Sequence, residues 1–97
     1  MRSSFKRIIS GNVPVLIDFY ADWCAPCKAL APVLEQVKRD LGEQVKIIKV
    51  DVDKNSSLAN KYQVRGVPTM ILFKHGQLVW RQSGVMDKET ILQAINT

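Results

Sequence analysis

Residues 15–28 read VLIDFYADWCAPCK, an apolar run that passes into a helical pattern and contains both cysteines of the chain. The run from Val13 to Tyr20 is bulky and β-branched without clean alternation, which is typical of a strand covered on both faces. From Cys24 onward, apolar residues recur at steps of three and four until Gly42, which predicts an amphipathic helix. Two thiols separated by two residues at the start of a helix can close a small disulfide ring, so the stretch indicates redox chemistry.

The two cysteines occupy different positions on this predicted helix. Cys27 begins the apolar stripe, whereas Cys24 lies at the very N-terminus. We therefore expect a buried Cys27 thiol and an accessible Cys24 thiol. Asp18 interrupts the preceding strand, where an ionised carboxylate among apolar side chains is costly. Its side chain is expected either to face an opening or to take part in the chemistry.

A second strand is predicted at residues 45–52. A helix connects it to the first strand, which implies a parallel, right-handed βαβ unit. Lys49 shares a face with Val45 and Ile47 by strand alternation, so its aliphatic stem is expected to pack in the interior even if its ammonium reaches a polar site.

The rest of the chain predicts two helices and a hairpin. A short helix begins near Ser56, and the apolar runs 69–73 and 78–81 are expected to form two antiparallel strands joined by a tight turn at Gly76. Asp87 is expected to cap a final helix.

Together with a short helix before Gly11, these elements follow the order helix, β, α, β, α, β, β, α. This order predicts an α/β fold with a mixed central sheet and helices on both faces. The chain has 97 residues, of which 46% are hydrophobic, and this is enough for one core. We therefore expect residues 1–97 to form a single domain.

Composition argues against several classes of protein. Two cysteines are too few for the disulfide framework of a small secreted protein, and with one distant histidine they do not supply the ligands of a zinc site. The net charge of +5 is spread along the chain without a basic patch interleaved with aromatics, which argues against a nucleic-acid partner. No segment reaches membrane-spanning length, and Ile8-Ile9 is followed at once by polar residues. We therefore expect no bound metal, no membrane partner and a cytoplasmic location.

Four separated motifs occur in the order that is typical of one family. They are IDFYADWCAPCK at residues 17–28, KVDVD at 49–53, RGVPT at 65–69 and SG at 83–84. On these motifs the chain resembles the thioredoxin family, and the resemblance runs from about Phe5 to the C-terminus. A lone Cys-x-x-Cys motif is a weak signal, but the ordered set is specific.

The resemblance implies a role for each residue of the cysteine site. Cys24 matches the attacking cysteine and Cys27 the resolving one. Asp18 matches a buried acid that relays a proton for Cys27, and burial should raise the pKa of its carboxyl while a nearby Lys49 ammonium lowers it. A flat surface around the thiols is expected to receive the substrate, and Pro68 is expected to follow a cis peptide bond. The residues of this surface are Trp23, Ala25, Pro26, Val67, Pro68 and Gly84.

The function implied by the resemblance is reduction of protein disulfides through dithiol/disulfide exchange. No cofactor is expected to be bound, and NADPH is expected to act only indirectly, through a thioredoxin reductase that regenerates the dithiol. Two alternatives share the fold: a thiol oxidase or isomerase of an oxidising compartment, and a binding module that holds a partner without turnover. The intact cysteine pair together with Asp18 and Pro68 favours the reductase.

The chain departs from the pattern of the family at three points. Ala25 stands where glycine is common, and Tyr20 stands where tryptophan is frequent. The third departure is the N-terminus, where the family usually has a strand before the first helix. We therefore expect about four strands, with residues 45–52 at an edge, and either a monomer or a weak dimer formed through that edge.

Overall fold

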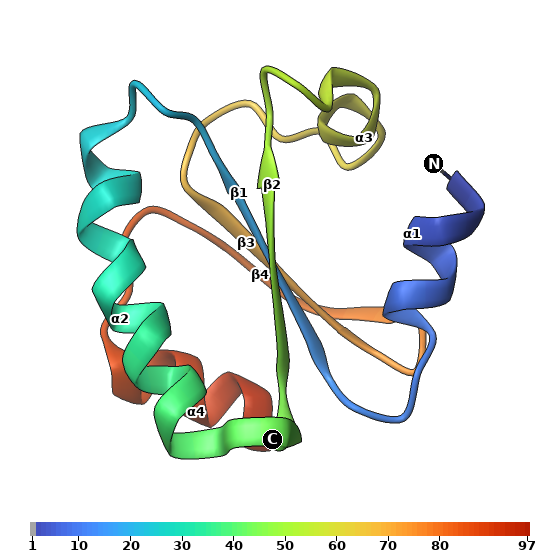
Figure 1. Ribbon diagram of the computed structural model, residues 1–97, viewed down its shortest axis with the longest axis vertical. Helices are drawn as coiled ribbons and strands as arrows, with labels where there is room; N and C mark the ends of the chain where they lie inside the picture. The colour runs from blue at the N-terminus through green and yellow to red at the C-terminus, as the bar shows by residue number, and fades with distance from the viewer. Residues whose placement is uncertain (1) are drawn as a thin grey trace.

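The computed structural model describes residues 2–97, with side chains from Ser4 onward. Four α-helices, one short 3-10 helix and four strands make up this described part (Figure 1). Their order and bounds are α1 (Arg2–Ile9), β1 (Val15–Tyr20), α2 (Ala25–Leu41), η1 (Gly42–Gln44), β2 (Lys46–Asp51), α3 (Ser56–Lys61), β3 (Thr69–Lys74), β4 (Gln77–Ser83) and α4 (Lys88–Asn96).

The four strands form one sheet in the order β2-β1-β3-β4. β1 pairs with β2 in parallel and with β3 antiparallel, and β3 pairs antiparallel with β4. This arrangement confirms the predicted α/β fold with a mixed four-stranded sheet, and it places β2 at one edge. The predicted first strand began two residues too early, at Val13 instead of Val15. The predicted bounds of the second strand were one residue too wide at each end, because Val45 and Val52 flank the ladder without belonging to it.

Alternating residues of the central strands build two cores, one on each face of the sheet. One face is covered by α1 and α3 and the other by α2 and α4, as Figure 1 shows. Val15, Ile17 and Phe19 of β1 enter the first core, whereas Leu16 enters the second. Asp18 and Tyr20 alternate with the first set, so they lie on the face covered by α2 and α4.

Two glycines permit the turns that the sequence predicted. Gly42 ends α2 with a φ of 55° and donates its backbone N–H to the carbonyl oxygen of Lys38. Gly76 has a φ of 80° in the turn between β3 and β4, where His75 also has a positive φ of 53°. Positive φ at both central residues suits a two-residue hairpin, because it matches the twist of the flanking strands.

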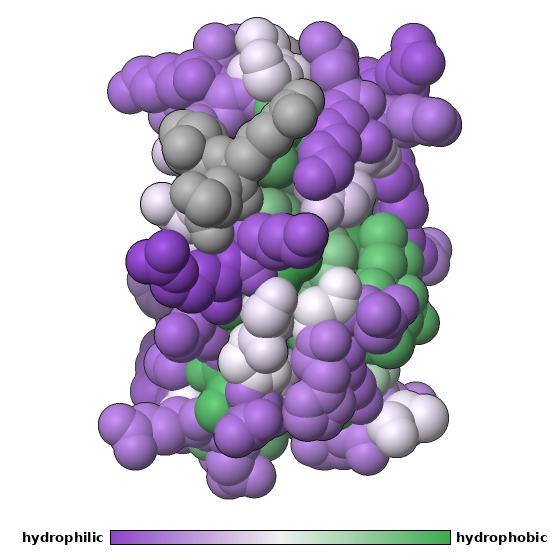
Figure 2. All heavy atoms as spheres, turned by 90° about the vertical axis from the view of Figure 1, so that its right-hand side faces the viewer, coloured by the Kyte–Doolittle hydropathy of each residue, from purple (hydrophilic) through white to green (hydrophobic). Residues whose placement is uncertain are grey.

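The face of the molecule that carries α1 is mainly hydrophilic, with smaller hydrophobic areas between the hydrophilic side chains (Figure 2). None of the helices described between residues 2 and 97 is both long and apolar enough to cross a bilayer. The same residues contain no group of three or more His, Cys, Asp and Glu side chains placed to hold a metal ion.

Candidate active site

The start of α2 is built around a disulfide bond. Cys24 and Cys27 are bonded to each other, with their Cα atoms 5.3 Å apart. Cys24 is also the N-cap residue of the helix: its backbone is extended, and its Sγ accepts a hydrogen bond of 3.1 Å from the backbone N–H of Cys27. Pro26 fits in the first turn, since a backbone N–H at that position has no carbonyl partner within the helix. The sequence thus places one sulfur against the positive end of a helix of 17 residues.

We expected a buried Cys27 and an accessible Cys24, and for this oxidised state that prediction is wrong. Cys24 is 3% exposed and Cys27 is 5% exposed. Cys24 is covered because its side chain turns back over the helix end to accept the Cys27 N–H, and because its Sγ lies 3.6 Å from the carbonyl oxygen of Val67. Position on the helix, rather than exposed area, is what distinguishes the two sulfurs.

Asp18 is a buried acid on the same face of the sheet as α2. It is 1% exposed, and within the part of the chain that the structure describes its Oδ1 has no hydrogen-bond partner. Burial raises the pKa of the Asp18 carboxyl from 3.8 to about 6, and attraction to the Lys49 ammonium opposes that rise. Both influences were predicted, and the resulting pKa lets this group exchange a proton close to neutral pH.

Lys49 lies beside Asp18 in the register of the two parallel strands. Its stem was expected to pack in the interior even if its ammonium reached a polar site, and the residue as a whole is exposed. The face of the strand was predicted correctly, but β2 is an edge strand and a pocket separates it from the start of α2. The ammonium lies in this open region, 4.6 Å from the centre of the Tyr20 ring.

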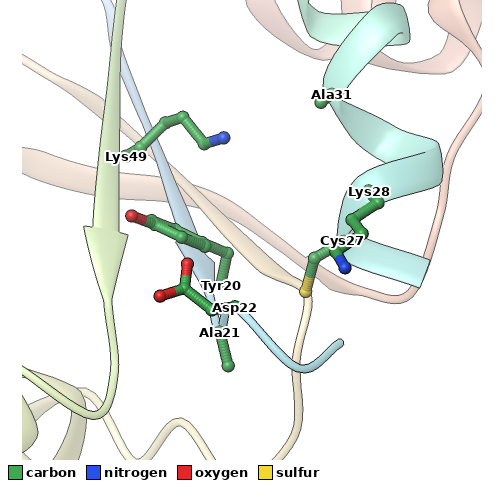
Figure 3. A pocket seen from close by; sticks show the side chains of 7 residues that line it. All are labelled: Tyr20, Ala21, Asp22, Cys27, Lys28, Ala31 and Lys49. Carbon is green, nitrogen blue, oxygen red and sulfur yellow. The ribbon is translucent and has the colours of Figure 1, made fainter. Parts of the chain in front are cut away.

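This pocket has a volume of about 220 Å³ and gives solvent a route to the disulfide. Figure 3 shows the side chains of Lys49 and Tyr20 on one side of it and Cys27 on the other. The lining comes from β1, the loop after it, α2 and β2, through residues Tyr20, Ala21, Asp22, Cys27, Lys28, Ala31 and Lys49.

A second segment, far from the cysteines in the sequence, also lies beside the disulfide. The peptide bond between Val67 and Pro68 is cis, which confirms the expectation for this proline. Val67 packs against the cysteines, and the carbonyl oxygen of Pro68 accepts a hydrogen bond of 2.9 Å from the backbone N–H of Gly84. Gly84 has a φ of 91°, a conformation that favours glycine. The structure therefore brings Val67, Pro68 and Gly84 together beside the disulfide.

The remaining predicted surface residues lie on the exposed side of the same region. Ala25 and Pro26 are exposed in the first turn of α2, and Trp23 is 70% exposed. Trp23 is held by a hydrogen bond of 3.0 Å from its Nε1 to an Asp53 carboxylate oxygen. A hollow of about 90 Å³ lies between Trp23 and Val67, so an apolar surface borders the cysteine pair on this side.

Comparison with known proteins places this site in a family. The model of the family described as Thioredoxin matches residues 1–97. The chain belongs to the thioredoxin family. A thioredoxin-like protein of Synechocystis is 43% identical over 94 residues, which is 96% of this chain and 90% of that protein. The solved structure of a mutant thioredoxin from Halobacterium salinarum matches with a TM-score of 0.87 and 40% identity, covering 97% of this chain and 81% of that one.

A third relative joins the family domain to a further activity in one chain. The bifunctional thioredoxin reductase/thioredoxin of Mycobacterium leprae is 45% identical over 94 residues, which is 97% of this chain and 20% of that protein. Thioredoxins are oxidoreductases that reduce disulfides by dithiol/disulfide exchange, and this chain has the Cys-x-x-Cys pair of that chemistry at Cys24 and Cys27. The family membership agrees with the resemblance found in the sequence.

Sequence reasoning missed two contacts of this thioredoxin site. One is the hydrogen bond between Trp23 and Asp53, and the other is the stacking of Lys49 on Tyr20. The parallel pairing of β1 with β2 could have indicated both, because it sets the ends of the two strands side by side. A one-residue error in register would have suggested different partners, however, so the pattern alone did not identify them.

Proposed function

We propose that the protein is a protein-disulfide reductase in which Cys24 attacks the substrate and Cys27 resolves the mixed disulfide. The observation that carries this assignment is the hydrogen bond from the Cys27 N–H to Cys24 Sγ at the start of α2. In the reduced protein, the same N–H and the positive helix end would favour a thiolate at Cys24. The thiolate is the reactive form of cysteine in disulfide exchange, so Cys24 is the better nucleophile for a substrate.

The reaction then takes two exchange steps. The Cys24 thiolate attacks one sulfur of the substrate disulfide, a bond forms between them, and the other substrate sulfur leaves as a thiolate. Cys27 loses its proton and attacks Cys24 Sγ, which forms the Cys24–Cys27 disulfide and releases the second substrate sulfur. Two electrons pass from the cysteine pair to the substrate, and the two substrate thiolates take up protons.

Asp18 is proposed to accept the proton that Cys27 loses in the second step. Support comes from its burial on the face of the sheet that α2 covers and from a pKa of about 6. A carboxyl with that pKa is mainly ionised at neutral pH, yet it binds a proton far more readily than an exposed aspartate. Lys49 is proposed to keep this pKa from rising further.

The substrate is proposed to be an extended segment of a protein that lies across the surface beside the disulfide. The residues of this surface are Trp23, Ala25, Pro26, Val67, Pro68 and Gly84. Val67 offers backbone groups next to Cys24, and Trp23 offers an exposed ring. A backbone-directed contact suits a reductase, because it is compatible with many substrate sequences.

The dithiol is proposed to be regenerated by a thioredoxin reductase that draws on NADPH, with no cofactor bound to this chain. The relative from Mycobacterium leprae, which joins a reductase to a thioredoxin in one protein, supports this pairing. We propose a cytoplasmic location, because a reductant of disulfides works in a compartment that keeps thiols reduced. Residues 1–97 are proposed to act as one domain.

A coupled assay tests the direction of the reaction. We expect this protein to support NADPH oxidation in a mixture of thioredoxin reductase and insulin, and we expect its disulfide to persist in all but strongly reducing glutathione mixtures. The control is a variant with both Cys24→Ser and Cys27→Ser, which keeps the surface but lacks the thiols. If mildly reducing glutathione mixtures reduce the Cys24–Cys27 disulfide completely, the protein is an oxidase. If the protein binds insulin but supports no NADPH oxidation, it is a binding module.

Self-association through β2 is proposed as a weak equilibrium. β2 is an edge strand, and the N–H of Lys46 donates inward to the carbonyl oxygen of Pro14, so alternation directs the N–H of Ile47 outward. We expect the sedimentation coefficient to rise with protein concentration. The Ile47→Pro variant, checked for folding by circular dichroism, should lose this dependence because it lacks the outward donor. A wild type that sediments as a monomer at every concentration would refute the dimer.

A further inference from the structure

The side chain of Lys49 is oriented by an aromatic ring. Its Nζ lies 4.6 Å from the centre of the Tyr20 ring, within the range in which a cation is attracted to an aromatic face. Figure 3 shows Lys49 extending from β2 above Tyr20, across the pocket from Cys27. Among the described side chains, Lys49 forms no ion pair. The Tyr20 ring is therefore the contact that fixes where this exposed ammonium lies.

The register of β1 and β2 places this contact between Lys49 and Tyr20 next to Asp18. Lys49 is the partner of Asp18 across the β1–β2 pair, and Tyr20 follows Asp18 by two residues on the same face of β1. An exposed lysine has many rotamers, and only some of them keep the ammonium near its strand partner. The ring selects the rotamers that lie over the end of β1.

We propose that Tyr20 is a positioning residue for disulfide exchange, whose ring holds the Lys49 ammonium where it acts on the Asp18 carboxyl. This inference deepens the proposed function and rests on the proton-relay role given there to Asp18. In this role Tyr20 acts through Lys49 and does not itself carry the proton. Its ring determines how strongly the Lys49 ammonium acts on the Asp18 carboxyl. It thereby determines the pH range in which Cys27 resolves the mixed disulfide.

Among the groups around Asp18, Lys49 is the one that opposes the effect of burial on the pKa of its carboxyl. Burial raises the pKa of Asp18, and the Lys49 ammonium lowers it. The β3 partner of Asp18 is Met70, which carries no charge. The titratable side chains around the adjoining pocket are Tyr20, Asp22, Lys28 and Lys49, and Cys27 lines it within the disulfide. Glu35 and Lys38 of α2 line a second pocket that Lys49 also borders.

A pair of substitutions at Tyr20 tests the inference through the titration of Asp18, measured by carbon NMR of its carboxyl. Tyr20→Leu removes the ring and is expected to raise the pKa of Asp18 by about half a pH unit, because the ammonium loses its fixed place. Tyr20→Phe keeps the ring and is expected to leave the titration unchanged. A fall in the pKa on Tyr20→Leu would overturn the inference, since it would mean that the ring mainly shields Asp18 from water.

A second set of variants, which carry Lys49→Met, removes the Lys49 ammonium itself. In Lys49→Met, the pKa of Asp18 is expected to rise by more than in Tyr20→Leu, and adding Tyr20→Leu should raise it no further. An equal rise from Tyr20→Leu with and without Lys49 would also overturn the inference.

The relay role is tested separately, by the rate at which Cys27 resolves a mixed disulfide. Asp18→Asn is expected to slow this step at neutral pH and to flatten its pH profile. An unchanged profile would refute the proposed relay, whereas the NMR titrations would still decide whether Tyr20 positions Lys49. The two failures are therefore distinguishable.

Discussion

Replacing Cys27 by serine is expected to lower the rate of insulin reduction to that of the assay without protein, and to leave Cys24 bonded to the substrate. Cys24 can still attack, because its Sγ keeps the backbone N–H of residue 27 and the helix end. A serine hydroxyl does not displace a sulfur from a disulfide, so the intermediate accumulates. Non-reducing gels and mass spectrometry of the linked peptides measure the product.

The matched control is Cys24→Ser, which leaves Cys27 as the single thiol. This variant should be equally inactive in turnover, but it should accumulate far less mixed disulfide, because Cys27 lacks the contact that stabilises a thiolate. If Cys24→Ser accumulates mixed disulfides through Cys27 as fast as the first variant does through Cys24, the assignment of attacker and resolver is reversed.

Replacing Asp18 by asparagine is expected to stabilise the fold at pH 7.5 by up to about 3 kcal/mol and to have little effect near pH 3. The sign follows from the raised pKa of Asp18, about 6 in the folded chain against 3.8 ordinarily. The folded state holds this proton more tightly than the unfolded state does. Its contribution is therefore fully present below pH 3.8 and is lost as the pH rises through about 6. Asparagine cannot ionise, so the variant avoids that loss.

Urea unfolding at a series of pH values measures this difference. Glu43→Gln is the matched control, because it removes a negative charge from an exposed side chain in η1. Its free energy of unfolding should differ from that of the wild type by a similar small amount at every pH. If Asp18→Asn raises the free energy of unfolding by the same amount at pH 3 and at pH 7.5, ionisation of Asp18 is not the source of that increase.

The fold was predictable because its strongest signals are local. The apolar run into β1, the helical period after Cys24 and the glycine of the β3–β4 hairpin each specify one element. The order of these elements then leaves few ways to arrange a mixed sheet. The edge position of β2 also followed, since residues 2–14 supply a helix rather than a strand.

The site was predictable only in part, because its contacts join segments far apart in the chain. Lys49 was placed on the correct face, but its exposure depends on how far α2 extends over β2, which strand alternation does not reveal. The burial of Cys24 depends on a hydrogen bond to its own helix and on the approach of Val67, 43 residues away. The partnership of Tyr20 with Lys49 required the register of two parallel strands.

The capping role of Cys24 couples the redox state of this protein to the start of its main helix. The sulfur that exchanges electrons is also the acceptor for a free N–H in the first turn of α2. A thiolate is a stronger acceptor than a disulfide sulfur, so the cap tightens on reduction and loosens on oxidation. By thermodynamic linkage, a substitution that strengthens this N–H contact more for the thiolate than for the disulfide favours the reduced protein and makes it a weaker reductant. Helix stability and reducing power therefore cannot be adjusted independently at this residue.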